Sequence, residues 1–269
     1  VVVMVVDYRR LQAWAGVVFG AVVVALALVL TPLGSTTNGA QSWFELGAYQ
    51  VQPSEYAKVG MIVTLAAVLG SRREAPGPRR LAAGLAAMAL VGVIGTVGMF
   101  KLNVLREYQK ERLTAFIDPS ADDGGRGFTY NSRQALIAIG SGGVTGKGYL
   151  RGSQTNLQYV PEQKTDFIFT VIGEELGFAG AMALLALLAL LLWRGLRIAA
   201  VARDPFGALL ATGVVTMLAF QAFVNIGMTI GIMPITGIPL PFVSYGGSSL
   251  VATFLAIGLL ENVHMRRYL

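Results

Sequence analysis

The segment "PFGALLATGVVTMLAFQAFVNIGMTIGIM" (205–233) contains no charged side chain from beginning to end. A helix needs about 20 predominantly apolar residues to cross the hydrocarbon core of a bilayer. Four more charge-free stretches of comparable length occur along the chain, at 13–30, 81–100, 176–193 and 235–260. The sequence therefore predicts an all-α, polytopic integral membrane protein, a bundle of membrane-spanning helices.

The overall composition agrees with this prediction. Hydrophobic residues make up 54% of the chain and charged residues 13%, whereas soluble domains carry roughly 25% charged residues. This shortage of charge argues against the alternative, a large soluble core of buried helices. The chain has no cysteine, which excludes a disulfide framework, a thiolate nucleophile and a cysteine-based metal site.

The net charge of +6 would suggest nucleic acid as a partner if the protein were soluble. Here most Lys and Arg residues cluster in short loops between apolar segments, which is typical of cytoplasmic loops. These clusters are Arg9/Arg10, Arg72/Arg73/Arg79/Arg80, Arg106/Lys110/Arg112/Arg126, Arg194/Arg197/Arg203 and Arg266/Arg267. The basic residues therefore indicate orientation, and we expect no nucleic-acid partner.

We expect one transmembrane domain over residues 1–269, with no second domain. Its external loops are predicted at about 31–53, 140–165 and 233–247. The predicted crossings are 13–30, 54–71, 81–100, 128–144, 167–193, 206–232 and 248–263. The first ten residues are too short for a signal peptide and lack a cleavage site.

The alternation of inside and outside loops fails at "LREYQKERL" (105–113). This basic cluster is expected inside, yet no apolar segment separates Phe100 from Arg106. Either the charge rule is misleading here, or residues are missing near 101–106, unresolved or deleted. We favour missing residues, which predicts a chain break or implausible geometry at that point.

Ionisable residues within membrane segments are costly and suggest function. In "QPSEYAKV" (52–59), Pro53 and Ser54 predict a helix start, and Glu55 and Lys58 then share one helix face. Two interpretations stay open. The pair anchors the helix end at the interface, or it forms a charged wall of an intramembrane cavity where Lys58 meets an anionic head group.

A second set of charges lies in "PEQKTDFIFTVIGEELGF" (161–178). If this segment is helical, Asp166 and Glu174 are about 12 Å apart along the axis, beyond the ~5–9.5 Å of a glycosidase pair. Asp166 either caps a helix or acts as a general base at the membrane–water boundary, where burial raises a carboxyl pKa. For Glu174 and Glu175 we expect a structural, hydrogen-bonded role.

The glycine-rich stretch "GSGGVTGKGYLRGSQ" (140–154) carries Lys147 and Arg151 but does not match a Walker A loop. It is either a flexible turn or a weak phosphate-binding loop. No cluster of His and carboxylates has metal-ligand spacing, although a divalent cation (Mg or Mn) centred on Asp166 stays open.

The stretch "GIMPITGIPLPFVSYGGSS" (231–249) is uncharged but rich in Pro and Gly, so it cannot be one regular helix. Irregular backbone at membrane depth is tolerated where it lines a cavity or is buried in protein. The segment is therefore expected either to line a cavity or to form a re-entrant structural plug.

Four motifs in order resemble the signatures of the SEDS family (shape, elongation, division, sporulation). They are "WFELGAYQVQPSEYAK" (43–58), "RLTAFIDPSADDGGRGFTYNSRQALIAIGSGG" (112–143), "LQYVPEQKTDFIFTVIGEELGF" (157–178) and "NIGMTIGIMPITGIPLPFVSYGGSSL" (225–250). The wording "GIPLPF" (237–242) resembles the RodA branch. The resemblance implies ten transmembrane helices in the bacterial plasma (inner) membrane. It also implies an outward-facing glycosyltransferase that polymerises lipid II into peptidoglycan for cell elongation and shape. The implied partners are a class B penicillin-binding protein and membrane lipids.

The resemblance also implies site residues. The essential extracellular aspartate of the family falls on Asp166, and its cavity pair on Glu55 and Lys58. Cations are expected to stabilise the departing pyrophosphate. The full set of expected substrate-binding residues is Glu55, Lys58, Gln134, Lys147, Arg151, Gln154, Ser244 and Ser248.

The chain departs from the family pattern in two places. The first transmembrane segment is a remnant (1–6), and the Pro-Asp-Leu-Gly segment is absent near residue 101. A chain that lacks these helices is expected to be inactive, so we expect unresolved rather than deleted segments. Two other functions remain as alternatives: a lipid II flippase and a membrane scaffold for a penicillin-binding protein.

Overall fold

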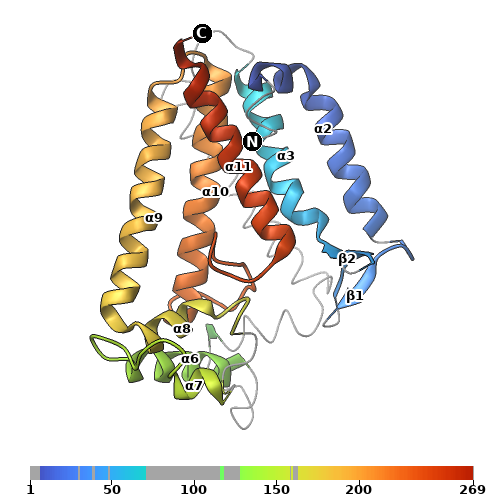
Figure 1. The fold of residues 1–269 in the computed structure, drawn as a ribbon. Helices are drawn as coiled ribbons and strands as arrows, with labels where there is room; N and C mark the ends of the chain where they lie inside the picture. Colours follow the sequence, from blue (N-terminus) through green and yellow to red (C-terminus); the bar gives the residue numbers. More distant parts are fainter. Residues whose placement is uncertain are drawn as a thin grey trace.

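The computed structural model describes residues 7–29, 31–37, 40–47, 49–70, 116–117, 128–157, 159 and 163–268. Within this part of the chain, five long helices stand side by side as a bundle (Figure 1). They are α2 (Tyr8–Val29), α3 (Pro53–Gly70), α9 (Gly177–Ala200), α10 (Pro205–Thr229) and α11 (Gly247–Met265), followed by the short helix η2 (Arg266–Tyr268).

Four of these helices, α2, α9, α10 and α11, are long and apolar enough to cross a membrane. Half of the most apolar window of α10 and of α11 is buried inside the protein, against 11% for α2 and 17% for α9. The buried helices form the centre of the bundle, and α2 and α9 leave apolar faces exposed. The predicted polytopic helical membrane fold is confirmed.

Helix α3 coincides with the predicted crossing 54–71 and begins at Pro53, as the sequence indicates. The prediction for 167–193 is wrong in detail, because two helices occupy this range. Helix α8 (Ile168–Glu175) ends at Leu176, and α9 starts at Gly177, whose φ of +65° favours glycine. The apolar residues on both sides concealed this break, which directly follows Glu174 and Glu175.

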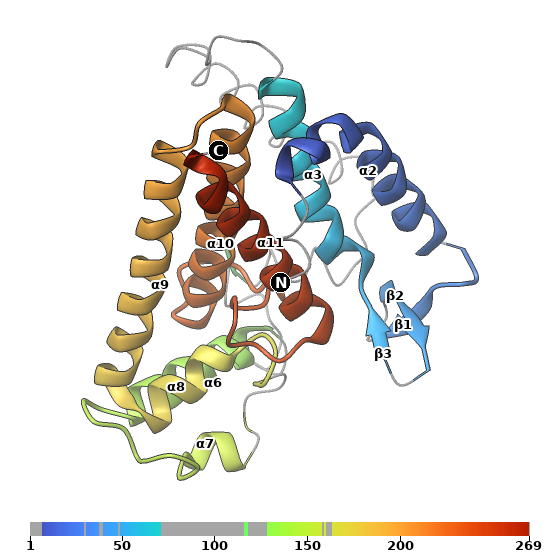
Figure 2. The ribbon, with the colours of Figure 1, turned by 45° about the horizontal axis from the view of Figure 1, so that its top comes forward.

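The predicted crossing at 128–144 is also corrected. Helix α6 (Phe128–Ser141) has 14 residues, which span only about 21 Å, short of a ~30 Å hydrocarbon core. It packs beside α8 at one end of the bundle, near the short helix α7 (Ser153–Asn156) (Figure 2). The predicted crossing 81–100 and the predicted gap at 101–106 lie outside the described residues.

The segment expected as an external loop at 31–53 contains an antiparallel sheet in the order β1-β2-β3. Its strands are β1 (Ser35–Thr37), β2 (Ala40–Leu46) and β3 (Tyr49–Val51). The hydroxyl of Ser248, at the start of α11, donates to the carbonyl of Gln50 (2.8 Å) and accepts from the amide of Gln52 (3.1 Å). These bonds attach β3 and the entry of α3 to α11.

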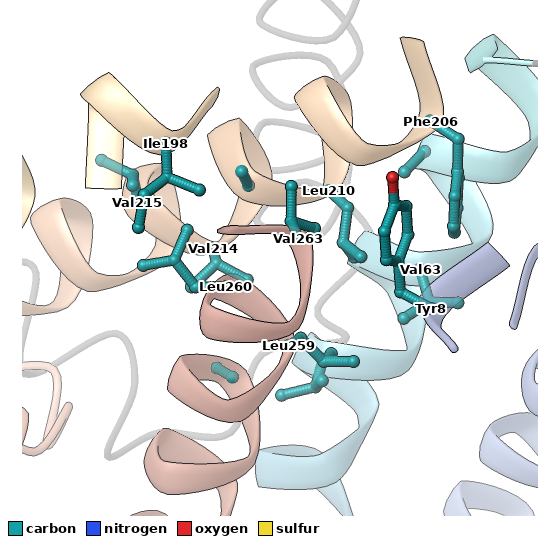
Figure 3. Packing of buried hydrophobic residues seen from close by; sticks show 14 of the residues in the cluster. Tyr8, Val63, Ile198, Phe206, Leu210, Val214, Val215, Leu259, Leu260 and Val263 are labelled. Carbon is teal, nitrogen blue, oxygen red and sulfur yellow. The ribbon is translucent and has the colours of Figure 1, made fainter. Parts of the chain in front are cut away.

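The main hydrophobic core lies between α2, α3, α9, α10 and α11 (Figure 3). Leu210 and Val214 of α10 are fully buried at its centre. Small residues let the helices approach closely, as Gly213 of α10 does against Ile62 of α3. Because lipid tails are as apolar as these side chains, close packing rather than exclusion of water holds such helices together.

The end of the bundle that carries the C-terminus is closed by a polar and aromatic cluster. Asp204 caps α10, since its carboxylate accepts from the amide of Gly207 (2.8 Å), and Pro205 occupies the first helical position. The hydroxyl of Tyr8 donates to the same carboxylate, and its ring stacks on Phe206 at 6.0 Å. This cluster joins the start of α2 to the start of α10.

Candidate active site

Helix α8 lies at the opposite end of the bundle from the C-terminus, together with the sheet and helices α6 and α7 (Figure 1), and Asp166 precedes α8 by two residues. It is half-buried in a turn, residues 163–166, that directly precedes α8. The residue at the cap position of α8 is Phe167. Asp166 is therefore neither part of the helix, as the spacing argument assumed, nor its cap.

The turn that carries Asp166 is fixed by two elements from the last third of the chain. The side-chain amide of Asn225, on α10, donates to the carbonyl oxygens of Asp166 and Ile238, both at 2.8 Å. The amide of Tyr245 donates to the carbonyl of Lys164 (2.8 Å). The backbone carbonyls of Lys164 and Asp166 are thus held by hydrogen bonds from Tyr245 and Asn225, respectively.

The neighbouring Phe167 anchors the same turn by apolar packing. Its ring is buried with Ala135 of α6, Met228 of α10 and Ile235 in a small second cluster. Ile235 belongs to the segment between α10 and α11, which has no helix or strand, as the Pro and Gly content predicted. This irregular segment therefore packs against the Asp166 turn.

Sequence reasoning did not single out Asn225. The residue is fully buried on a helix that is apolar enough to span a membrane. Polar side chains in such a helix are functional suspects, so the amide in the charge-free stretch 205–233 was the available signal.

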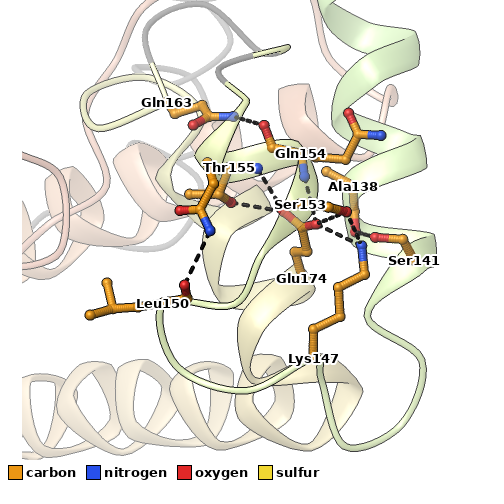
Figure 4. Close-up of polar contacts among 10 residues, drawn as sticks. Ala138, Ser141, Lys147, Leu150, Ser153, Gln154, Thr155, Gln163 and Glu174 are labelled. Atoms are coloured by element: carbon orange, nitrogen blue, oxygen red, sulfur yellow. Dashed lines mark hydrogen bonds and ion pairs between the residues drawn. The ribbon is translucent and has the colours of Figure 1, made fainter.

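Glu174 is the centre of a polar network that closes the glycine-rich loop (Figure 4). Its carboxylate is fully buried and accepts from Lys147 Nζ (2.7 Å), from the amides of Gln154 and Thr155 (2.9 Å each), and from the hydroxyls of Thr155 (2.8 Å) and Ser153 (3.3 Å). The predicted structural role of Glu174 is confirmed.

The electrostatics of this network follow from its donors. Burial by itself would raise the pKa of Glu174, but the bonds from Lys147, Gln154 and Thr155 outweigh it and lower the pKa to about 2. The carboxylate is therefore ionised at every pH at which the protein would work.

Lys147 and Arg151, both expected to bind substrate, have different surroundings. Lys147 Nζ is 2.7 Å from both Glu174 Oε1 and Ser153 Oγ, so its charge is largely matched within the protein. Arg151 is exposed on the loop. The structure does not bring these two cations together with the Glu55–Lys58 pair.

Glu55 and Lys58 form the expected ion pair, with Lys58 Nζ 2.8 Å from Glu55 Oε1. Glu55 is buried, while a third of the Lys58 side chain is exposed (34%). Lys58 lines a cavity of about 650 Å³ between α3 and α10, whose walls are mostly apolar and include Met61 and Phe220. The pair bridges the first turn of α3, and Lys58 is its member that lines the cavity; a substrate-binding role for the pair stays a prediction.

The remaining expected substrate-binding residues are spread over the same end of the protein. Ser244 Oγ accepts from the amide of Leu240 (2.8 Å), and Ser248 is bonded to β3 as described above. Gln134 is half-buried on α6. Gln154 Oε1 is buried and lacks a hydrogen-bond partner within the described part of the chain.

Among the described residues, no three His, Cys, Asp or Glu side chains lie together in a way that could hold a metal ion. A divalent cation at Asp166 stays a prediction, and the residues described around it do not supply a ligand set. What the site can do chemically rests on the half-buried side chain of Asp166, whose backbone carbonyl is held by Asn225.

Comparison with known proteins identifies the family. A family model described as "Cell cycle protein" and named for FtsW, RodA and SpoVE matches residues 1–97 and 77–269. This chain belongs to the FtsW/RodA/SpoVE family. The SEDS resemblance noted in the sequence is therefore confirmed, with a RodA-like member as the best description.

Several FtsW/RodA/SpoVE relatives are similar to the chain over nearly all of its length. Stage V sporulation protein E of Bacillus subtilis (strain 168) is 36% identical over 301 residues, covering 97% of this chain and 81% of the relative. The peptidoglycan glycosyltransferase MrdB of Escherichia coli (strain K12) is 35% identical over 306 residues, covering 99% and 82%.

Solved structures of the family show the same fold. The crystal structure of the Thermus thermophilus rod shape determining protein RodA matches with a TM-score of 0.64 and 33% identity, covering 100% of this chain and 83% of that one. A structure described as coordinating polymerization and crosslinking in a peptidoglycan synthase complex matches with a TM-score of 0.75 and 33% identity, covering 99% and 85%.

The alignments with the family relatives extend over 301 and 306 positions, more than the 269 residues of this chain. The relatives thus have internal residues without a counterpart here. The two segments that match the family model overlap at 77–97. The missing segment predicted near 101–106 falls outside the described residues and stays a prediction.

Proposed function

We propose that this protein is a RodA-like peptidoglycan glycosyltransferase of the bacterial plasma membrane, which polymerises lipid II at the outer face. The observation that carries the proposal is the 35% identity to a peptidoglycan glycosyltransferase across 99% of the chain and 82% of the relative. The apolar helices of the bundle support a membrane-embedded enzyme.

In this proposal Asp166 is the general base. It accepts the proton of the 4-hydroxyl of the acceptor GlcNAc, and the hydroxyl oxygen attacks the anomeric carbon of the donor strand with inversion. The bond from that carbon to the pyrophosphate oxygen breaks, and polyprenyl pyrophosphate leaves. The partial exposure of Asp166 and its fixed backbone support this role.

The substrate has a lipid tail and a charged head, and the surfaces of the protein suit both. The 650 Å³ cavity between α3 and α10 is mostly apolar, and its one charged lining residue among those described is Lys58, near the start of α3. An ammonium beside an apolar groove fits a polyprenyl phosphate, because phosphate charge needs a cation and the chain needs an apolar wall. Lys58 is the cation of this groove that suits the pyrophosphate.

We also propose a class B penicillin-binding protein as partner. Support comes from the similarity to a structure whose description couples polymerization to crosslinking in one synthase complex. A partner of this kind would supply the transpeptidase for the strands that this protein extends.

The test is polymerisation of fluorescent lipid II by purified protein in detergent, with the partner present. The 269-residue chain is compared with a form in which the internal segment of a relative is restored near residue 101. Asp166→Asn is compared with Glu45→Gln, which removes an exposed carboxylate from β2.

We expect the protein with an unmodified site to form polymer, Asp166→Asn to form none, and Glu45→Gln to form polymer as the unmodified protein does. Polymer from the restored form alone would mean that the internal segment is required. Near-normal polymerisation by Asp166→Asn would disprove the base assignment. Absence of polymer from both forms would disprove the enzyme proposal, and lipid II movement across vesicles would then favour the flippase.

A further inference from the structure

Asn225 makes two hydrogen bonds that together connect the Asp166 turn to the irregular segment 231–246. Both hydrogens of its side-chain amide are used, one for the carbonyl of Asp166 and one for the carbonyl of Ile238. Asn225 itself is fully buried on α10. One rigid side chain on a rigid helix therefore sets the position of the backbone at residue 166.

The buried amide of Asn225 lowers the stability of the fold, and apolar packing alone gives no reason for an amide at this position. Burying an amide is unfavourable unless its groups are bonded, and Asn225 Oδ1 lacks a partner within the described residues. An apolar residue would fill the same space on α10 without this cost. The two bonds of Nδ2 are thus the feature that favours asparagine at this position.

The carbonyl that Asn225 holds belongs to the same residue as the candidate base. Fixing this carbonyl restricts the Cα from which the carboxylate extends, and Tyr245 restricts the backbone two residues earlier through Lys164. Catalysis depends strongly on such placement, because a displacement of ~1 Å can cost about 100-fold in rate.

We propose that Asn225 is a positioning residue, which holds the peptide of Asp166 so that its carboxylate meets the acceptor hydroxyl. The inference rests on the proposed role of Asp166 as general base. It extends that role by naming the side chain that controls the geometry of the base from a helix remote in sequence.

The test measures kcat and KM for lipid II in the more active form of the protein. Asn225→Asp keeps the size of the side chain but replaces both donor hydrogens with an oxygen that repels the two carbonyls. The matched control is Thr229→Val, one turn further along α10, where an equally buried hydroxyl bonds, within the described part of the chain, to its own helix at the carbonyl of Ile226 (2.7 Å). Thermal unfolding of each variant shows whether it is folded.

We expect Asn225→Asp to lower kcat by about 10- to 100-fold, with KM within about twofold of the unmodified protein. Thr229→Val should retain both constants. In an Asp166→Glu background, which already displaces the carboxylate by one methylene, Asn225→Asp should reduce kcat much less, because the two changes act through one group.

An unchanged kcat in folded Asn225→Asp would overturn the inference, as would a rise in KM alone or a full additive loss in the Asp166→Glu background. If Asn225→Asp does not fold, Asn225→Gln serves the same test, since it keeps both donors but moves them outward. The kcat of Asn225→Gln should fall, and an unchanged kcat in this variant would also overturn the inference. Inactivity of the unmodified protein would instead count against the proposed function.

Discussion

The ammonium of Lys147 lies 2.7 Å from Oε1 of the fully buried Glu174, although 27 positions separate the two residues in the chain. The backbones of the two segments are also hydrogen-bonded to each other, because the amides of Lys147 and Gly148 donate to the carbonyls of Glu174 and Glu175 (3.0 Å each). In return, the first amides of α9, at Phe178 and Ala179, donate to the carbonyls of Gly143 and Val144. The glycine-rich loop thus caps the end of α8 and the start of α9 at once.

Glu174→Gln should destabilise this end of the protein at neutral pH. The folded pKa of about 2 lies below the ordinary value of 4.5, a difference worth about 3 kcal/mol. Because the folded pKa is lowered, the stabilisation is complete above about pH 4.5 and disappears as the pH falls towards 2. Thermal unfolding of the unmodified protein should show this loss, while Glu174→Gln should be nearly insensitive to pH there. A matching pH dependence in both proteins would contradict the assignment.

Lys147 and Arg151 should respond differently to removal of their charge. Lys147→Met leaves the buried Glu174 carboxylate without its cation, so a loss of about 3 kcal/mol in stability is expected. Arg151→Ala, on an exposed side chain, should leave the unfolding temperature unchanged and raise KM for lipid II. A stable Lys147→Met protein with a raised KM would instead favour substrate binding as the main role of Lys147.

Two glycines near the end of α6 should tolerate alanine very differently. A Cβ at residue 142 would collide with the carbonyl oxygens of Gly173 and Glu174, whereas a Cβ at residue 140 meets nothing within 4 Å. Gly142→Ala should therefore cost about 3 kcal/mol or prevent folding, since backbone must move. Gly140→Ala should be neutral or stabilising by up to about 1 kcal/mol, because alanine favours helices. Unfolding temperatures of the purified variants provide the comparison.

The cluster at the other end should affect stability without affecting catalysis. Asp204→Ala removes both the cap of α10 and the partner of the Tyr8 hydroxyl, so a loss of about 2 kcal/mol or more is expected. Tyr8→Phe keeps the ring packing on Phe206 and should cost only about 1 kcal/mol. Both folded variants should polymerise lipid II at the unmodified rate. A large fall in kcat for Tyr8→Phe would mean that the two ends are coupled.

Apolar length was sufficient to predict most of the bundle. Helices α2, α10 and α11 lie where charge-free sequence predicted crossings, and α3 lies at the predicted crossing that carries Glu55 and Lys58. The break at Leu176–Gly177 and the short α6 were missed because the apolar character of a segment gives neither the exact ends of a helix nor its backbone conformation. The sheet within 35–51 was predicted as a loop, although Phe44, Glu45 and Leu46 of β2 pair with Val51, Gln50 and Tyr49 of β3.

The candidate site was predicted as a set of residues rather than as an arrangement. Local spacing was enough for the Glu55–Lys58 pair, because both residues lie on one helix turn. The Lys147–Glu174 pair and the bond from Asn225 to the Asp166 carbonyl depend on tertiary contacts between distant segments. Single-sequence patterns contain no information on such contacts, so the role of Asn225 emerged only from the structure.

The turn around Asp166 takes its shape from Asn225 and Tyr245, which lie far downstream in the chain. When synthesis has reached the end of α9, Asp166 is therefore present in the nascent chain, but Asn225 and Tyr245, which hold its backbone, are not yet made. The nascent chain should therefore be catalytically inactive until α10 and the segment leading into α11 have been synthesised and have entered the membrane. Truncation within the last third would accordingly yield inert protein even if every earlier helix were correctly embedded.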